Sequence, residues 1–98
     1  MAKLSPEQIT EKLKALPAWE RKGEMIAKQY TFKEFVESIR FVDRIAEIAE
    51  QIDHHPDDIT VNYRRVTFTI TTHDQGGIIT EKDFKLADAI EREFTSLK

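Results

Sequence analysis

The chain contains no cysteine, no long apolar segment and no excess of basic residues, and each absence argues against a class of function. Without cysteine there is no disulfide framework, no thiolate nucleophile and no zinc–thiolate site. No apolar run approaches the roughly 18 residues that a membrane span requires. The formal net charge of -3 argues against a nucleic-acid partner, because proteins of that class usually carry a basic face.

The start of the chain, from Met1 to Glu7, lacks the apolar core of a secretory signal peptide. The lack of cysteine fits a reducing compartment, so we expect the protein to be cytoplasmic. A length of 98 residues, with 40% hydrophobic and 34% charged side chains, suits one globular domain spanning residues 1–98.

Three capping patterns predict three helices. Ser5-Pro6-Glu7-Gln8 combines an N-cap serine, a proline at the first helical position and a glutamine at N3, and its helix should end before Pro17. Thr31-Phe32-Lys33-Glu34 should begin the longest helix, of about 20 residues, which should end near Asp53 because a proline follows shortly after. Thr80-Glu81-Lys82-Asp83 should begin the third helix.

Apolar spacing predicts which helix faces are buried. In the long helix, the predicted inward residues are Phe35, Val36, Ile39, Val42, Ile45, Ala46, Ala49 and Ile52. Phe41 and Ile48 fall outside this stripe, so they are either scattered exposed residues or part of an interface between subunits. The other helices should bury Ile9, Leu13 and Leu16, and Phe84, Ala87, Ile90 and Phe94.

Strand patterns occupy the segments between the helices. Residues 19–21 and 25–30 flank Lys22-Gly23 and predict a hairpin. Two further strands alternate Ile59, Val61 and Tyr63, and Val66, Phe68 and Ile70, with polar residues, mostly threonine, on the other face. The order α-β-β-α-β-β-α predicts an α+β domain, with a four-stranded, mostly antiparallel sheet and helices packed on one face.

All three histidines of the chain fall between Glu50 and His73, which indicates proton-transfer chemistry, because imidazole titrates near neutrality. His54 and His55 precede a proline, so they should lie in a turn or extended segment with side chains pointing in different directions. His73 should end a strand, on its threonine face. Asp83, in the first turn of the third helix, could orient an imidazole, bind a substrate or simply cap its helix.

Other interpretations of these residues remain open at the level of sequence. The histidines could be surface residues without a role, and Glu50 could be an ordinary surface carboxylate. Glu50, His54 and His73 could together bind a metal, because Glu50 and His54 are four residues apart. No recognised zinc spacing such as HExxH is present, and we predict no metal site.

The pattern Glu50-x3-His54-His55-Pro56, followed by Tyr63, His73 and Asp83, resembles that of the pterin-4a-carbinolamine dehydratases. Chain length and element order extend the resemblance over nearly the whole chain. It implies a hydro-lyase that converts 4a-hydroxytetrahydropterin to quinonoid dihydropterin and water, which recycles the cofactor of aromatic amino acid hydroxylases. The pterin would be the substrate, and the reaction needs no further cofactor.

The resemblance also implies residue roles and partners. His54, His55 and His73 match the family's three catalytic histidines. His54 and His73 would transfer protons, with acid and base unassigned, and His55 would hold the pterin, which Asp83 and Glu50 would bind or orient. Family members form dimers or tetramers, so we expect a homo-oligomer. Some relatives are dimerisation cofactors of a homeodomain transcription factor or assembly factors, which makes a non-catalytic binding role the alternative. The presence of all three histidines favours the enzyme.

Two features depart from the family pattern. Many relatives carry a tryptophan shortly after Pro56, where this chain has Asp57-Asp58-Ile59. The loop after His73, from Asp74 to Ile79, is one residue longer than in the vertebrate members. Both changes lie beside the expected pocket and bear on its shape, but neither removes a proton-transfer group.

Overall fold

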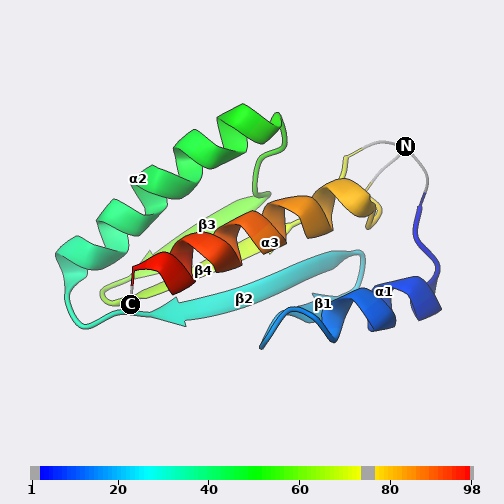
Figure 1. Ribbon diagram of the computed structural model, residues 1–98, viewed down its shortest axis with the longest axis horizontal. Helices are drawn as coiled ribbons and strands as arrows, with labels where there is room; N and C mark the ends of the chain where they lie inside the picture. The colour runs from blue at the N-terminus through cyan, green and yellow to red at the C-terminus, as the bar shows by residue number, and fades with distance from the viewer. Residues whose placement is uncertain (1–2, 74–76, 98) are drawn as a thin grey trace.

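The computed structural model describes residues 3–73 and 77–97, and its elements follow the predicted order (Figure 1). The elements are α1 (Pro6–Leu13), β1 (Glu20–Lys22), β2 (Met25–Thr31), α2 (Phe35–Ile52), β3 (Asp58–Asn62), β4 (Arg65–Ile70) and α3 (Glu81–Ser96). The strands form one antiparallel sheet in the order β1-β2-β4-β3, and α2 and α3 cover one face of it. The predicted α+β architecture is confirmed. Within the described residues, no helix is long and apolar enough to cross a membrane.

The hairpin predicted at Lys22-Gly23 joins β1 to β2. Lys22 pairs with Met25 across the turn, and the Nε of Arg21 donates to the carbonyl of Gly23 over 2.8 Å. Gly23 has a φ of 63°, in the left-handed region that glycine adopts without steric cost. The turn therefore depends on a glycine at this position.

The capping patterns predict the starts of α1 and α3 correctly. The backbone N–H of Gln8 donates to the Ser5 hydroxyl over 3.1 Å, and the Gln8 side chain accepts from the Ser5 N–H over 2.8 Å. At α3, the Thr80 N–H donates to the Asp83 carboxylate over 2.8 Å. The first helix ends earlier than predicted, at Leu13, and Leu16 is buried from the turn that follows.

The predicted start of α2 at Thr31 is wrong. Thr31 is the last residue of β2 and pairs with Arg65, so the sheet ladder takes the residue that the local pattern assigned to a helix cap. The N-cap is Glu34, whose backbone N–H donates to the carboxylate of Glu37 over 3.1 Å.

The buried stripe of α2 also differs from the prediction. Its buried residues are Ser38, Phe41, Ile45 and Ala49, while the exposed apolar ones include Phe35, Val36, Ile39 and Ala46. Phe41 is only 1% exposed and belongs to the core, and Ile48 packs partly against it, so neither alternative considered from sequence, an interface or scattered exposed residues, describes them. The helix carries two apolar stripes, and spacing alone does not tell which one meets the sheet.

An aromatic cluster decides which stripe is buried. Five rings from β2, the segment after it, α2, β4 and α3 pack with centroids 4.6 to 6.0 Å apart, and most pairs meet edge to face or tilted: Tyr30, Phe32, Phe41, Phe68 and Phe94. Such geometries are the favourable ones for aromatic pairs. Phe41 is the residue through which α2 joins this cluster.

A polar contact inside the apolar layer fastens β2 to α3. The Glu91 carboxylate accepts hydrogen bonds from Lys28 Nζ and the Tyr30 hydroxyl, both over 2.7 Å. The side chains of Lys28 and Glu91 are 11% and 18% exposed. Burial by itself raises the pKa of Glu91, but the hydrogen bonds from Lys28 and Tyr30 outweigh it and hold the pKa below its ordinary value of 4.5.

We expect Glu91→Gln to lower the free energy of unfolding by about 2 kcal/mol, because Lys28 loses its charge partner in a mostly buried site. Urea denaturation at pH 7 measures this. Because folding lowers the pKa of Glu91, its stabilisation is present above about pH 4.5 and is lost as the pH falls through the folded-state pKa.

The stability gap between wild type and Glu91→Gln should therefore shrink in acid. The control is Glu47→Gln, which alters an exposed ion pair on α2 and should change stability little. Equal effects of the two substitutions would contradict a special role for Glu91.

Candidate active site

The C-terminus of α2 sets the direction of the histidine segment. The helix ends at Ile52, close to the predicted Asp53, which adopts a left-handed conformation with a φ of 63°. Asp and Asn are the non-glycine residues that tolerate this conformation best. The following backbone N–H, of His54, donates to the Ala49 carbonyl over 3.1 Å. This closed turn stops the helix and directs the next residues toward the sheet.

The segment 54–56 then crosses from α2 to β3 past the end of β4. The end of this segment next to β3 is held by a hydrogen bond from the Asp57 N–H to the Thr69 carbonyl over 2.6 Å. Beyond β4, the Thr72 N–H donates to the Ile78 carbonyl over 2.9 Å, and the Ile78 N–H donates to the Thr72 carbonyl over 2.8 Å. The ends of α2 and β4 and the start of α3 therefore converge. The loop predicted to be longer than in vertebrate relatives, 74–79, lies partly outside the described residues.

A cavity of about 240 Å³ lies at this convergence. It is lined by Asp53, His54, His55, Thr71, Thr72, His73 and Lys82, so the fold brings all three histidines to one place. A larger cavity of about 660 Å³, between α2 and α3, has no histidine in its lining. The groups suited to proton transfer near neutral pH therefore gather at the smaller cavity.

Each imidazole contacts a carboxylate through its Nε2 atom. The pairs are His54 with Asp83 over 2.7 Å, His55 with Glu50, and His73 with Asp57. An ionised carboxylate only accepts hydrogen bonds, so in each pair Nε2 carries the proton. Within the described part of the chain no hydrogen bond reaches an Nδ1 atom of these three imidazoles.

The three contacts differ in burial. The side chain of His54 is 12% exposed and that of Asp83 is fully buried, whereas His55 and His73 are 57% and 73% exposed. A contact shielded from water holds its geometry better than an exposed one, because competing water and salt weaken exposed pairs. Among the three imidazoles, His54 therefore has the most firmly fixed ring.

Asp83 is held by a chain of hydrogen bonds. Its Oδ2 accepts from the Thr80 N–H, and the Thr72 hydroxyl lies 3.1 Å from both of its oxygens. The Thr80 hydroxyl accepts from the Lys82 N–H and lies 2.8 Å from the Thr72 hydroxyl, so Thr80 can donate to Thr72, which donates to Asp83. Asp83 both caps α3 and contacts His54, and it lies behind that ring instead of lining the cavity.

Glu50 does not lie with His54 and His73, the two residues that the sequence suggested as its partners in a metal site. Because α2 ends at Ile52, Glu50 faces His55 and not His54, and its side chain is 75% exposed. Among residues 3–73 and 77–97, no group of three or more metal-ligating side chains is arranged to hold an ion.

Asp57, Thr72 and Lys82 are among the residues of the site to which sequence reasoning gave no role. Asp57 directly follows the His-His-Pro run, and its position there was a signal. Thr72 continues the inward parity of Val66, Phe68 and Ile70, and a polar residue at an apolar position indicates a buried hydrogen bond. Lys82, hidden in a helix-capping pattern, gave no signal of its own.

We expect Thr72→Val to lower the free energy of unfolding by about 1–3 kcal/mol, because the buried Asp83 carboxylate loses a donor while the side-chain volume is kept. Thr69→Val is the matched control: the same substitution on β4, at a partly buried side chain on the opposite face of the sheet. Thermal or urea unfolding of both variants measures the difference. A loss no larger at Thr72 than at Thr69 would contradict the hydrogen-bond chain.

Comparison with known proteins shows the family to which the chain is similar. The family model for pterin 4 alpha carbinolamine dehydratase matches residues 2–93. A Thermomicrobium roseum protein is 48% identical, over 89% of this chain and 91% of its own length, and a Mycobacteroides abscessus protein is 47% identical, over 93% and 95%. Both are provisionally named pterin-4-alpha-carbinolamine dehydratases.

Two solved structures are also similar. The transcriptional coactivator/pterin dehydratase of Brucella melitensis superposes with a TM-score of 0.86 at 32% identity, over 93% of this chain and 97% of that one. A pterin dehydratase-like protein identified as a RuBisCO assembly factor shares the fold, with a TM-score of 0.62 at 20% identity, over 76% and 83%. From the family match and these relatives, the chain belongs to the pterin-4-alpha-carbinolamine dehydratase family.

Proposed function

We propose that this protein dehydrates 4a-hydroxytetrahydropterin to quinonoid dihydropterin and water. The observation that carries the proposal is the single cavity bordered by three imidazoles, each backed by a carboxylate, in a chain of this family. A volume of about 240 Å³ is below the range typical of drug-sized ligands and suits one small ring system. The product would return to the cofactor cycle of an aromatic amino acid hydroxylase, the functional partner we propose.

The reaction asks for two proton movements at neighbouring atoms. The C4a–O bond breaks and the hydroxyl leaves as water, so an acid must supply a proton. The N5–H bond gives its proton to a base, and its electrons form the N5=C4a double bond. Imidazole serves in either direction near neutral pH, and the two steps need no electron transfer.

His54 and His73 are the residues that we propose for these two transfers. In both, Nε2 is occupied by a carboxylate, so Nδ1 would be the atom that exchanges a proton with the pterin. We leave open which of the two is the acid, because the same contact suits both roles. Asp83, through its contact with His54, would be a positioning residue.

His55 would hold the pterin ring, with Glu50 orienting its imidazole. Lys82 adds a cation to the cavity lining and would suit a carbonyl oxygen of the substrate. Besides His54 and His73, the cavity lining therefore offers an imidazole and an ammonium group as hydrogen-bond donors.

The test is the dehydration rate of freshly generated 4a-hydroxytetrahydropterin, followed by absorbance after subtraction of the uncatalysed rate. We expect His54→Ala and His73→Ala each to lower kcat by about 10²- to 10⁴-fold, as removal of a general acid or base does. His55→Ala should mainly raise KM. Circular dichroism checks folding, and Arg92→Ala, at an exposed site on α3, is the surface control.

The outcomes separate the residue roles from the activity. No acceleration by the wild-type protein would overturn the proposed function. Acceleration that persists in both His54→Ala and His73→Ala would overturn the assignment of the two histidines and leave the activity standing.

We also propose that the protein self-associates through the exposed apolar side chains of α2 and β3. This surface comprises Phe35, Val36, Ile39, Ile59, Val61 and Tyr63. The rings of Phe35 and Tyr63 stack at 6.5 Å, which shows that the helix start and the β3–β4 turn form one continuous surface. β3 lies at the edge of the sheet, and an unpaired edge beside an apolar surface favours pairing with a second copy.

If so, changing Val36 and Ile39 together to aspartate should lower the mass measured by light scattering to that of a single chain. Both side chains are exposed, at 52% and 43%, so the fold should tolerate the change. Lys85→Asp, at an exposed position on α3, controls for added negative charge. A wild-type protein of single-chain mass, or a doubly substituted protein of unchanged mass, would rule this surface out. An unchanged mass of the doubly substituted protein would also mean that this surface gives no support to the alternative function as an assembly factor or coactivator.

A further inference from the structure

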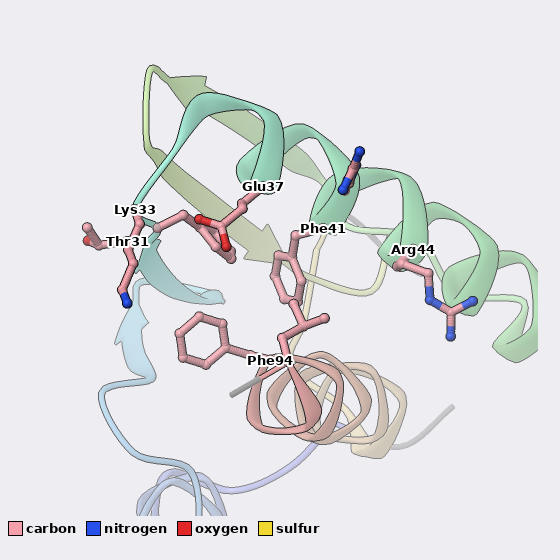
Figure 2. A pocket seen from close by; sticks show the side chains of 9 residues that line it. Thr31, Lys33, Glu37, Phe41, Arg44 and Phe94 are labelled. Atoms are coloured by element: carbon pink, nitrogen blue, oxygen red, sulfur yellow. The ribbon is translucent and has the colours of Figure 1, made fainter.

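The largest cavity described above opens between the first half of α2, the end of β2 and the last turns of α3. Figure 2 shows Phe41 projecting from α2 and Phe94 from α3 toward the space between the two helices. The histidine cavity lies at the other ends of the same two helices, so the two cavities are separate. With about 660 Å³, this groove has the size of a site for a small organic molecule.

Three phenyl rings form the floor of the groove. Phe32, Phe41 and Phe94 contact one another pairwise, with centroids 5.2, 5.6 and 5.9 Å apart. Phe32 and Phe94 are only partly buried, so the floor is accessible from the groove. A ring placed on this floor could meet the phenyl groups in the edge-to-face or offset geometry that aromatic pairs prefer.

The rim of the groove is mainly cationic. Lys33, Arg40 and Arg44 line it together with a single carboxylate, Glu37. Arg44 is held by Glu93 and Glu47, over 3.3 and 3.6 Å, whereas in the described part of the chain Lys33 and Arg40 form no ion pair. Glu37 uses one oxygen to accept the N–H at the start of α2. Two cations are thus available above an apolar aromatic floor.

We propose that this groove binds an aromatic organic anion, in which a ring system carries a carboxylate or sulfonate group. The ring would rest on Phe32 and Phe94, which Phe41 supports from the core, and the anionic group would meet Lys33 and Arg40. A neutral apolar molecule would leave both cations unpaired, and a phosphate without a ring would leave the aromatic floor uncovered. The proposal is independent of the proposed dehydratase activity, because none of the groups it uses lines the histidine cavity.

The probe is 8-anilinonaphthalene-1-sulfonate, an aromatic sulfonate whose fluorescence rises in an apolar site. We expect the folded wild-type protein to bind it and the double variant Lys33→Glu/Arg40→Glu to bind it about tenfold more weakly, as expected for the loss of two exposed charge contacts. Lys85→Glu, with half the charge change at an exposed site on α3, should leave the affinity unchanged. Near-ultraviolet circular dichroism of each protein confirms that the core is packed.

Two further measurements locate the site and define its ligand class. Backbone amide shifts on titration should concentrate in residues 31–33, 40–44 and 94–97, with little change at Val36, Ile39, Ile59 and Val61. Cinnamate should displace the probe better than cinnamyl alcohol, which has the same skeleton without the charge. Because Leu97 lines the groove and is 56% exposed, Leu97→Glu is a second variant that should also weaken binding without harming the fold.

Several results would overturn the proposal. These are no binding by the folded wild type, equal affinity in the double variant and in Lys85→Glu, shifts confined to the histidine cavity or to the apolar surface of α2 and β3, or equal competition by cinnamate and cinnamyl alcohol.

Discussion

The buried carboxylate of Asp83 is the constraint on which the rest of the site depends. A carboxylate without exposure to water is costly unless its oxygens accept hydrogen bonds, and here donors come from Thr72, Thr80 and His54. These donors belong to the exit of β4, the start of α3 and the segment after α2. Satisfying one carboxylate therefore fixes the relative positions of three chain segments, and the cavity is the space that remains between them. Stability and site geometry share the same contacts.

The site combines one fixed imidazole with two adjustable ones. His54 contacts a carboxylate that is itself held by buried donors, whereas the partners of His55 and His73 are surface side chains of which Glu50 is mostly exposed. Exposed charged pairs contribute little and exchange readily with water, so the contacts of the two outer imidazoles are weaker than that of His54. This division would suit the proposed dehydration, in which one proton would move at a set position while the other groups adapt to the substrate. Asp57, which contacts His73, stands in the segment where many relatives carry tryptophan.

The sequence predicted the fold well because its signals were redundant. Strand alternation, two of three capping patterns and the glycine of the first hairpin all agreed, and each is a local property that tertiary packing did not override. His54, His55, His73 and Asp83 were singled out because histidine is rare in this chain and the motif resembles a known family, and the structure brings the three histidines to one cavity. Thr72 and Lys82 were missed, because threonine is ordinary in strands and lysine is ordinary at a helix start. Their importance arises only when the ends of distant elements meet, which no local pattern records.

The error on α2 has a physical cause that bears on function. The helix meets the core through Phe41, exposes Phe35, Val36 and Ile39 beside β3, lines the aromatic groove with Arg40 and ends where the histidines begin. A helix with one face on the core and the other in solvent shows a single apolar stripe, and the spacing of its apolar residues then identifies the buried side. Here apolar residues serve two faces, so spacing identifies a helix without identifying its orientation. The second stripe is therefore informative in itself: an apolar row that the core does not need indicates a surface that contacts something else.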